Sequence, residues 1–292
     1  MTAAGPSPDV RQADALPRRT LAGYATGSLV TGAFGTVPGL LLLPYLTDTL
    51  GVAAGVAGLL VLLPKAWDVL VNPVAGRLSD RRGDRRPLLL GAGLALGVLF
   101  AAMFAGPLGS GPDAGAYVAL AFLAAATAFA LFQVPYVAMP AELTDGYAER
   151  TRLMTWRVAV LALAILVSGA LAPLVVERTG GGLTGHRWAG VFVGALIVVG
   201  TLGTYVGTRT ARMTAAPATE PSLRAQLRVA AGNRSFRALL LCFVIQSAGI
   251  GTMLAGVQYF ADHVLVRQAG ATLLFAAFVG PALLVMPLWS RV

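Results

Sequence analysis

Uninterrupted apolar stretches, separated by short polar segments, run along almost the whole chain. Each stretch is close to the roughly 20 residues that a helix needs to cross the ~30 Å hydrocarbon core of a bilayer. Within them, for example at 88–99 and 158–167, polar and apolar residues do not alternate as they do in lipid-facing strands. The pattern therefore predicts an all-α membrane protein with spanning helices at 21–46, 53–76, 87–108, 115–141, 153–176, 188–208, 236–261 and 269–290.

The composition agrees with this pattern and excludes a soluble domain. Hydrophobic residues make up 57% of the chain, charged residues make up 12%, and the mean hydropathy is +0.74. Cys242 is the single cysteine and cannot form a disulfide within one chain, while His186 and His263 fall in predicted loops, too far apart for a metal cluster. We therefore expect no metal site and no cofactor apart from a coupling ion.

The distribution of arginine predicts the orientation of the chain. Basic residues gather in the amino-terminal tail and in the loops after the second, fourth and sixth spans, whereas the alternate loops carry few. By the positive-inside rule we expect a multi-pass protein of the cell inner (plasma) membrane with a cytoplasmic amino terminus. These loops account for the net charge of +9, so nucleic acid is not an expected partner. The predicted domains are a cytoplasmic tail at 1–19, a six-helix bundle at 20–208, a cytoplasmic linker at 209–234 and the first two helices of a second bundle at 235–292.

A short basic loop, Gly-Arg-Leu-Ser-Asp-Arg-Arg-Gly-Asp-Arg-Arg-Pro at 76–87, follows the second span. Gly76 allows a close helix approach, Asp80 can pair with an arginine, and Pro87 suits the first turn of the next helix. An ordinary basic cytoplasmic loop is the simpler interpretation. The order of residues nevertheless resembles the loop signature of the major facilitator superfamily, where this loop helps to close the cytoplasmic side during alternating access. The resemblance implies a cytoplasmic gating set of Gly76, Asp80, Arg81, Gly83, Arg85, Arg86 and Glu142.

Further polar groups within and beside the spans form a second pattern. They are Lys-Ala-Trp-Asp at 65–68 with Asn-Pro at 72–73, Val-Pro-Tyr at 134–136, Met-Pro-Ala-Glu-Leu-Thr at 139–144, Glu-Arg-Thr-Arg-Leu at 149–153, and Asn-Arg-Ser-Phe at 233–236 leading into Gln-Ser at 246–247. Together they resemble the glycoside-pentoside-hexuronide:cation symporter family, which implies twelve helices in two halves around a midplane site. Because the chain stops after about eight helices, we expect an incomplete bundle, with the missing carboxy-terminal helices supplied by a longer gene product.

Asp68 is the most informative single residue. A carboxylate near the middle of a spanning helix costs about 2.5–3.5 kcal/mol on insertion scales, and it usually faces a polar cavity or a partner. Lys65 and Asn72 lie on the same helical face. One interpretation is a structural Lys65–Asp68 pair, and the other is a site for a coupling proton or cation. Because Asn72 stands where sodium-coupled members of the family carry a second aspartate, the resemblance leaves a proton, or less directly sodium, as the coupling ion.

The resemblance also implies the residues that bind the solute, namely Tyr24, Gln133, Arg157 and Gln246. Gly32 and Gln133 stand where the family carries sugar-binding carboxylates, so the family pattern is only partly kept. Gln133 can bond a hydroxyl and Arg157 a carboxylate, although Arg157 is equally consistent with an arginine that extends towards the membrane surface.

Several functions are consistent with these features. The leading hypothesis is a secondary active transporter for symport of a small hydroxylated solute, a sugar, glycoside or uronide, with membrane lipid as its surroundings. A lipid-like or drug-like solute on the same fold is the alternative in the same class, and a non-transporting membrane scaffold or non-functional fragment is the alternative in another. An enzyme is not expected, because the spans carry no convergent set of candidate catalytic residues.

Overall fold

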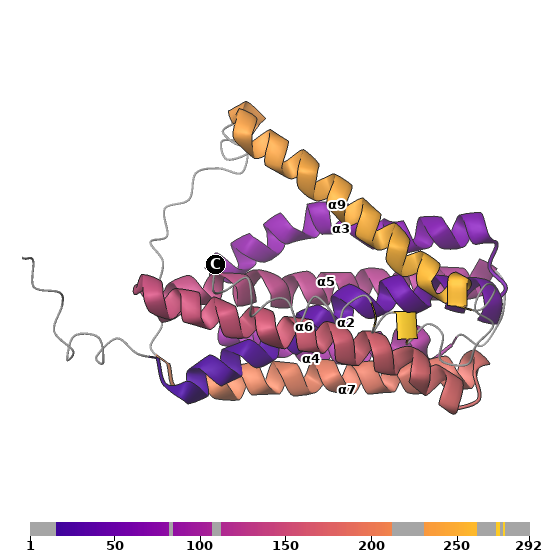
Figure 1. The fold of residues 1–292 in the computed structure, drawn as a ribbon, viewed down its shortest axis with the longest axis horizontal. Helices are drawn as coiled ribbons and strands as arrows, with labels where there is room; N and C mark the ends of the chain where they lie inside the picture. The colour runs from indigo at the N-terminus through magenta and orange to yellow at the C-terminus, as the bar shows by residue number, and fades with distance from the viewer. Residues whose placement is uncertain are drawn as a thin grey trace, which may run out of the picture.

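The computed structural model describes residues 16–81, 84–106, 112–211, 231–261, 273, 274 and 277. Among these residues the chain is helical and contains no strand (Figure 1). The main elements are α2 (Arg18–Pro44), η1 (Tyr45–Thr49, a π-helical turn), α3 (Ala54–Asp80), α4 (Arg86–Phe104), α5 (Pro112–Leu143), α6 (Tyr147–Arg178), α7 (Gly182–Thr208) and α9 (Arg234–Phe260).

Seven helices within the described part of the chain are long and apolar enough to cross a membrane. They match the first seven predicted spans and confirm a multi-pass, all-α membrane protein. A helix satisfies its backbone hydrogen bonds internally, which the hydrocarbon core requires. The predicted eighth span at 269–290 lies almost wholly outside the described residues, as do residues 1–15 of the predicted tail and most of the linker at 209–234.

One boundary differs from the prediction. Helix α7 begins at Gly182 rather than near 188, so His186 lies in a helix and is 7% exposed, whereas the sequence placed it in a loop. The cause is the turn between α6 and α7, in which Gly180, Gly181 and Gly182 all have positive φ. This tight turn leaves the polar residues that follow it to form the first turns of α7.

The first six helices pack together in one bundle. Helix α2 lies against α6 and α7, α4 lies between α5 and α7, and α3 packs on α5. Helices α2 and α7 approach each other closely, because a Cβ atom built on Gly23 would come within 2.4 Å of the Cα atom of Gly207. Small residues allow such close backbone packing between membrane helices.

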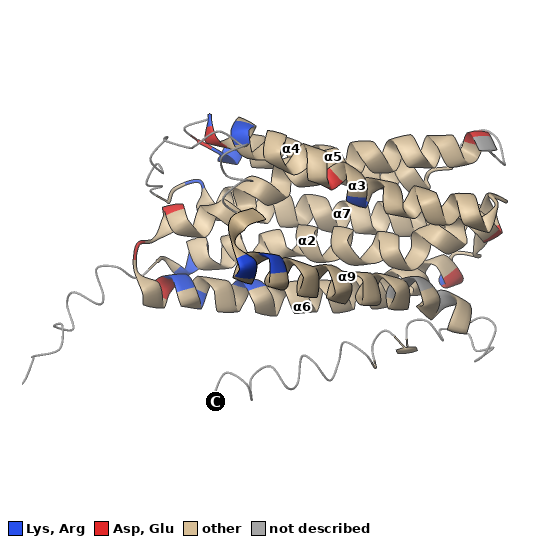
Figure 2. Cartoon of the chain, turned by 90° about the horizontal axis from the view of Figure 1, so that it is seen from above, with Lys and Arg blue, Asp and Glu red and all other residues tan. Residues whose placement is uncertain are grey.

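Helices α3 and α9 expose most of their surface. Only 11% of the most apolar window of α3 is buried, and none of the corresponding window of α9, compared with 72% for α2. Figure 1 shows α9 leaning away from the bundle at its start and approaching it at its end. Figure 2 shows lysine and arginine concentrated at the end of the bundle where α4 and α6 begin, as the arginine distribution in the sequence indicates.

Candidate functional site

A polar cluster between α2, α5 and α6 brings together three of the four residues predicted to bind a solute. The rings of Tyr24 and Tyr136 are stacked, with centroids 4.7 Å apart. The guanidinium carbon of Arg157 lies 5.2 Å from the centre of the Tyr136 ring, within the range of a cation–π contact. Gln133 precedes Tyr136 by three residues on α5 and therefore shares its helical face. The cluster combines a cation, an amide and two phenols inside the membrane-spanning region.

Ser28 fixes the geometry of this cluster. Its fully buried hydroxyl lies 2.9 Å from the backbone oxygen of Arg157 and 3.0 Å from the hydroxyl of Tyr136. The Tyr136 hydroxyl also lies 2.9 Å from the backbone oxygen of Tyr24. These bonds link α2 to α5 and α6 beside the guanidinium. No sequence pattern singled out Ser28, although this residue follows Tyr24 by one helical turn, and Tyr136 stood out only as part of a motif.

Three buried polar atoms in the cluster lack a hydrogen-bond partner in the described part of the chain: Oη of Tyr24, Oε1 of Gln133 and Nε of Arg157. Leaving such an atom unpaired costs about 1–3 kcal/mol, and proteins usually reserve such atoms for a ligand, an ordered water or a functional role. None of the described ion pairs involves Arg157, whose Nη1 lies 3.8 Å from the sulfur of Met154. The cluster can therefore supply a donor, an acceptor and a hydroxyl to an incoming polar molecule.

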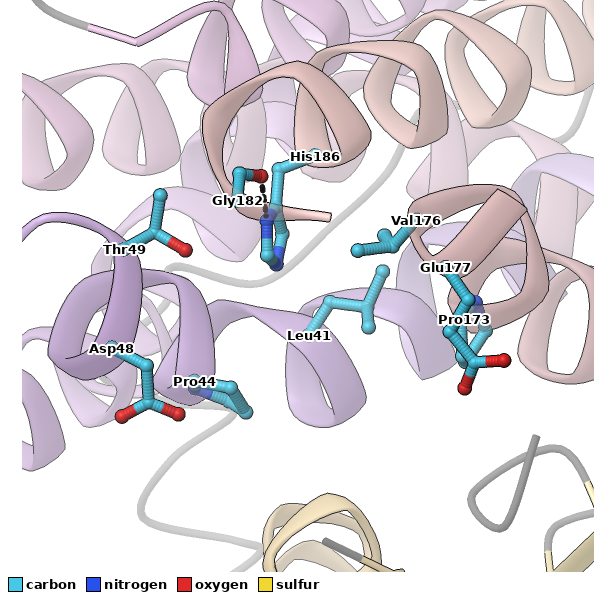
Figure 3. Close-up of a pocket in the computed structure, with 9 residues that line it drawn as sticks. All are labelled: Leu41, Pro44, Asp48, Thr49, Pro173, Val176, Glu177, Gly182 and His186. Atoms are coloured by element: carbon cyan, nitrogen blue, oxygen red, sulfur yellow. Dashed lines mark hydrogen bonds between the residues drawn. The ribbon is translucent and has the colours of Figure 1, made fainter. Parts of the chain in front are cut away.

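A cavity of about 240 Å³ lies near the end of the bundle where α7 begins (Figure 3). Its lining residues are Leu41, Pro44, Asp48, Thr49, Pro173, Val176, Glu177, Gly182 and His186. The imidazole Nδ1 of His186 lies 2.7 Å from the carbonyl oxygen of Gly182, so this nitrogen carries the hydrogen. None of the residues predicted to bind the solute or the coupling ion lines this cavity, so it is separate from the polar cluster.

Helix α3 holds the three residues predicted to bind the coupling ion. Asp68 is partly buried near the middle of the helix, and Lys65 and Asn72 are exposed. Lys65 and Asp68 form no ion pair within 4.0 Å in the described part of the chain, so the structural pair, one of the two interpretations of these residues, is not found there. The neighbouring Trp67 donates a hydrogen bond of 2.9 Å from its indole nitrogen to Thr127, which ties this part of α3 to α5.

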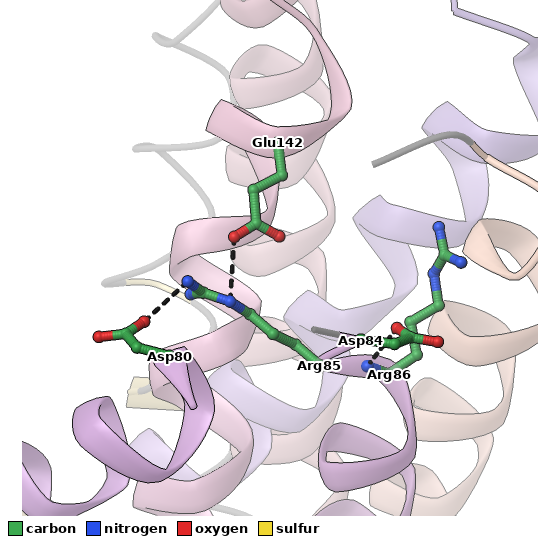
Figure 4. A network of polar contacts seen from close by, with 5 residues as sticks. All are labelled: Asp80, Asp84, Arg85, Arg86 and Glu142. Carbon is green, nitrogen blue, oxygen red and sulfur yellow. Dashed lines mark hydrogen bonds and ion pairs between the residues drawn. The ribbon is translucent and has the colours of Figure 1, made fainter. Parts of the chain in front are cut away.

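The loop after α3 forms an ion-pair network with α5 (Figure 4). Arg85 lies 2.7 Å from Asp80 at the end of α3 and 3.0 Å from Glu142 near the end of α5. The side chains of Arg85 and Glu142 are 11% and 9% exposed, so this pair is largely buried, whereas Asp80 is 40% exposed. The predicted pairing of Asp80 with an arginine is therefore present, and Arg85 also joins the loop to α5.

Arg86 joins the same loop to α7. Its guanidinium donates hydrogen bonds to the backbone oxygens of Arg209 and Ala211, just beyond the last turn of α7, where carbonyls lack helical partners. Its own backbone nitrogen donates to Asp84 at 3.0 Å. Arg81 caps the end of α3 through its backbone nitrogen, which bonds to the carbonyl oxygen of Arg77. Gly83 lies outside the described residues.

Three positions that the sequence pattern singled out are not part of the polar cluster. A Cβ atom on Gly76 would meet nothing closer than Val134 at 4.0 Å, so the close helix approach predicted there is wrong. A Cβ atom on Gly32 would lie 2.7 Å from that of Ala164, so this position is filled by helix packing and does not have room for a carboxylate. Gln246 lies on the exposed part of α9 and contacts none of the described cluster residues.

A second contact that no sequence pattern indicated lies at the start of α6. The carboxylate of Glu149 accepts a hydrogen bond of 3.1 Å from the backbone nitrogen of Leu16, just before α2. The same carboxylate lies 3.3 Å from Arg152. Glu149 belongs to a motif that the sequence did single out, but its partner is a backbone group that side-chain patterns do not reveal.

Comparison with known proteins decides the family. Residues 23–292 match the model of a family described as MFS/sugar transport protein. The chain belongs to this family. The match confirms the resemblance to the major facilitator superfamily and is to a family of transporters rather than of enzymes.

Individual relatives point to the same group of symporters. The chain is 28% identical over 256 residues to "Putative glycoside/cation symporter YagG" of Escherichia coli (strain K12), covering 82% of this chain and 54% of the relative. It is 23% identical over 239 residues to the inner membrane symporter YicJ of the same organism, covering 80% and 51%. It is 30% identical over 141 residues to the glucuronide carrier protein homolog of E. coli (strain K12), covering 46% and 31%. The chain thus spans about half the length of the first two relatives.

Proposed function

We propose that the protein is a secondary active transporter that moves a small hydroxylated solute, a sugar, glycoside or uronide, by proton- or cation-coupled symport with alternating access. The proposal places it in the inner membrane with the basic end of the bundle, and hence the amino terminus, in the cytoplasm. It is supported by the family, by relatives named as a glycoside/cation symporter, an inner membrane symporter and a glucuronide carrier homolog, and by the polar cluster.

The unpaired atoms of Tyr24, Gln133 and Arg157 carry the solute part of the proposal. A bilayer core offers no hydrogen-bond partner, so polar atoms of spanning helices are paired within the protein or interact with a polar ligand or water. A sugar hydroxyl both donates and accepts, which suits the phenol and the amide oxygen, and a carboxylate suits the guanidinium. A uronide carries both groups and would use all three side chains.

Asp68 carries the coupling part of the proposal. Its carboxylate lies in the middle of α3 without a close ion-pair partner among the described residues, so a bound proton or cation would neutralise a charge that is costly in the membrane. Asn72 lies one turn further along the same face and would add an oxygen to such a site. The positive charge of Lys65 favours the ionised form of the Asp68 carboxylate. It would therefore help Asp68 to release its proton again.

A transport assay on the complete gene product in proteoliposomes tests the solute. Radiolabelled sugars, glycosides, uronides and lipids are offered with and without a proton or sodium gradient, and Arg157→Gln is compared with Arg178→Gln, an exposed arginine on the same helix. A hydrogen bond to a charged group is worth about 1.5–3 kcal/mol, so Arg157→Gln should weaken uronide binding by about 10- to 150-fold while the control does not. Uptake of lipids but of no hydroxylated solute would favour the alternative solute class.

Substitution of Asp68 tests the coupling separately. Asp68→Asn should abolish gradient-driven accumulation and keep solute counterflow, because the coupling group is lost while the polar cluster is intact. Asp113→Asn, at the exposed start of α5, is the matched control and should accumulate normally. Asn72→Asp should shift the preference towards sodium. Normal accumulation by Asp68→Asn under a proton gradient would show that Asp68 is structural.

A further inference from the structure

Helix α9 contacts the six-helix bundle at its end. The hydroxyl of Tyr259 lies 2.9 Å from the hydroxyl of Thr47 in η1, across 212 positions of sequence. Val257 and Ala261, on the same part of the chain, are 8% and 1% exposed. The end of α9 is therefore packed on the bundle, and a hydrogen bond between two side chains lies within this contact.

Proton counting gives the direction of this bond. The Thr47 hydroxyl also lies 2.6 Å from a carboxylate oxygen of Asp48 and 3.1 Å from the carbonyl oxygen of Leu43, and both of these atoms only accept. Thr47 therefore gives its single proton to one of them, and Tyr259 donates to Thr47. A donor and an acceptor therefore meet in this contact, which distinguishes it from simple apolar packing.

The opposite end of α9 is free of such contacts. Every residue from 231 to 253 is exposed, and no described hydrogen bond or ion pair joins this stretch to the first six helices. Figure 1 shows the same arrangement, because α9 is farthest from the bundle where it begins and nearest where it ends. The two parts of the chain thus meet at the end away from the basic loops and are apart at the basic end.

The segment that carries Thr47 departs from regular α-helical geometry. It is a π-helical turn, closed by a bond of 3.1 Å from the nitrogen of Leu50 to the oxygen of Tyr45, and it follows Pro44, which has no N–H to donate. Single π-helical turns within helices occur frequently at functional sites. The cavity of about 240 Å³ adjoins this segment at Pro44, Asp48 and Thr49, which leaves space for the turn to move (Figure 3).

We infer that the Tyr259–Thr47 hydrogen bond is a gate contact that holds the two parts of the chain together at the non-basic end while the basic end is open. Thr47 and Tyr259 are then positioning residues of the transport cycle, with η1 as the element that moves when the contact breaks. The role in transport rests on the proposed function, whereas the effect on the arrangement of the helices does not. A net hydrogen bond of this kind changes a two-state equilibrium by about 2- to 10-fold.

Distance measurement by double electron–electron resonance tests this gate in the complete gene product. Spin labels are attached at the basic end through Tyr147→Cys on α6 and Arg237→Cys on α9, both exposed positions, after every native cysteine has been replaced by serine. Loss of the contact should favour closure of the basic end. Tyr259→Phe and Thr47→Val should therefore each raise the ratio of the short-distance to the long-distance population by about 2- to 10-fold.

Two control variants make the result specific. Thr47→Ser keeps the hydroxyl and should match the parent, and so should Tyr205→Phe, whose hydroxyl on α7 has no described hydrogen-bond partner. Parent-like distances in both Tyr259→Phe and Thr47→Val, or an equal shift in Tyr205→Phe, would overturn the gate. If Thr47→Val does not fold, Tyr259→Phe, which removes one oxygen atom, decides alone. A shift in distances without any solute transport would reject the proposed function and keep the gate.

Discussion

Replacing Gly23 by alanine is expected to separate α2 from α7. The new Cβ atom would lie 2.4 Å from the Cα atom and 3.0 Å from the carbonyl carbon of Gly207, and 3.1 Å from the oxygen of Gly203. All three are backbone atoms, so no side-chain rotation can relieve the clash. Ordinary contact begins at 3.4 Å, which requires the two helices to move apart by about 1 Å.

The size of the effect follows from two opposing contributions. Inserting a methyl group into a well-packed interface costs about 1–3 kcal/mol. Alanine also gains about 0.8–1 kcal/mol over glycine in a helix interior. Gly35→Ala isolates this gain, because Gly35 lies on the same helix and its Cβ atom would meet nothing within 4 Å. The difference between the two variants therefore measures the clash itself.

Thermal unfolding of the purified protein in detergent, followed by tryptophan fluorescence, is a suitable assay. For a chain of this size about 1 kcal/mol corresponds to about 2–4 °C, so Gly23→Ala should have a Tm about 2–12 °C below that of Gly35→Ala. Gly207→Ala meets the same contact from the other helix and should behave similarly. Equal Tm values for Gly23→Ala and Gly35→Ala would refute the close approach of α2 and α7.

Two further substitutions test the loop network and the position that resembles a sugar site. Arg85→Gln should lower the unfolding free energy by about 3–5 kcal/mol, because it leaves Glu142 buried and unpaired. Asp80→Asn removes a more exposed partner of Arg85 and should lower the unfolding free energy by only about 0.2–1 kcal/mol. The same Tm assay separates these outcomes, and equal shifts would contradict the difference in burial. Gly32→Asp should destabilise the bundle without improving sugar binding, because the aspartate side chain would collide with Ala164. Tighter binding of a labelled sugar by this variant would show that the position faces the solute.

The hydrophobic pattern was sufficient to place the seven spanning helices of the described residues, because each span must both match the bilayer thickness and satisfy its own backbone. The start of α7 was predicted too late in the sequence, because the polar residues after Gly182 are typical of a loop. In the structure these residues continue the helix from a glycine turn. The position of an apolar stretch therefore locates a membrane helix. It underestimates the length of the helix where the helix extends beyond the most apolar residues.

Tertiary partners were less predictable, because they depend on which faces meet. The close helix approach expected at Gly76 is absent, whereas Gly23, which no sequence pattern singled out, lies against the backbone of Gly207 on another helix. Similarly, Ser28 is an unremarkable serine until its hydroxyl is found next to Tyr136 on another helix. The candidate residues for solute binding came from a family resemblance, and their convergence depends on contacts that no local pattern encodes.

The two polar contacts join different parts of the chain, and in the proposed gate only one of them opens. The Arg85–Glu142 pair lies within the six-helix bundle and is largely buried, so removing one partner is costly, about 3–5 kcal/mol. The Tyr259–Thr47 bond joins this bundle to α9 and is worth about 0.5–1.5 kcal/mol. A contact that must open and close repeatedly needs a free energy near thermal energy, whereas one that keeps helices of a single rigid unit together does not. On the proposed gate, therefore, the hydrogen bond lies between parts that move relative to each other, and the ion pair, whose partners are costly to leave unpaired, lies inside one of them.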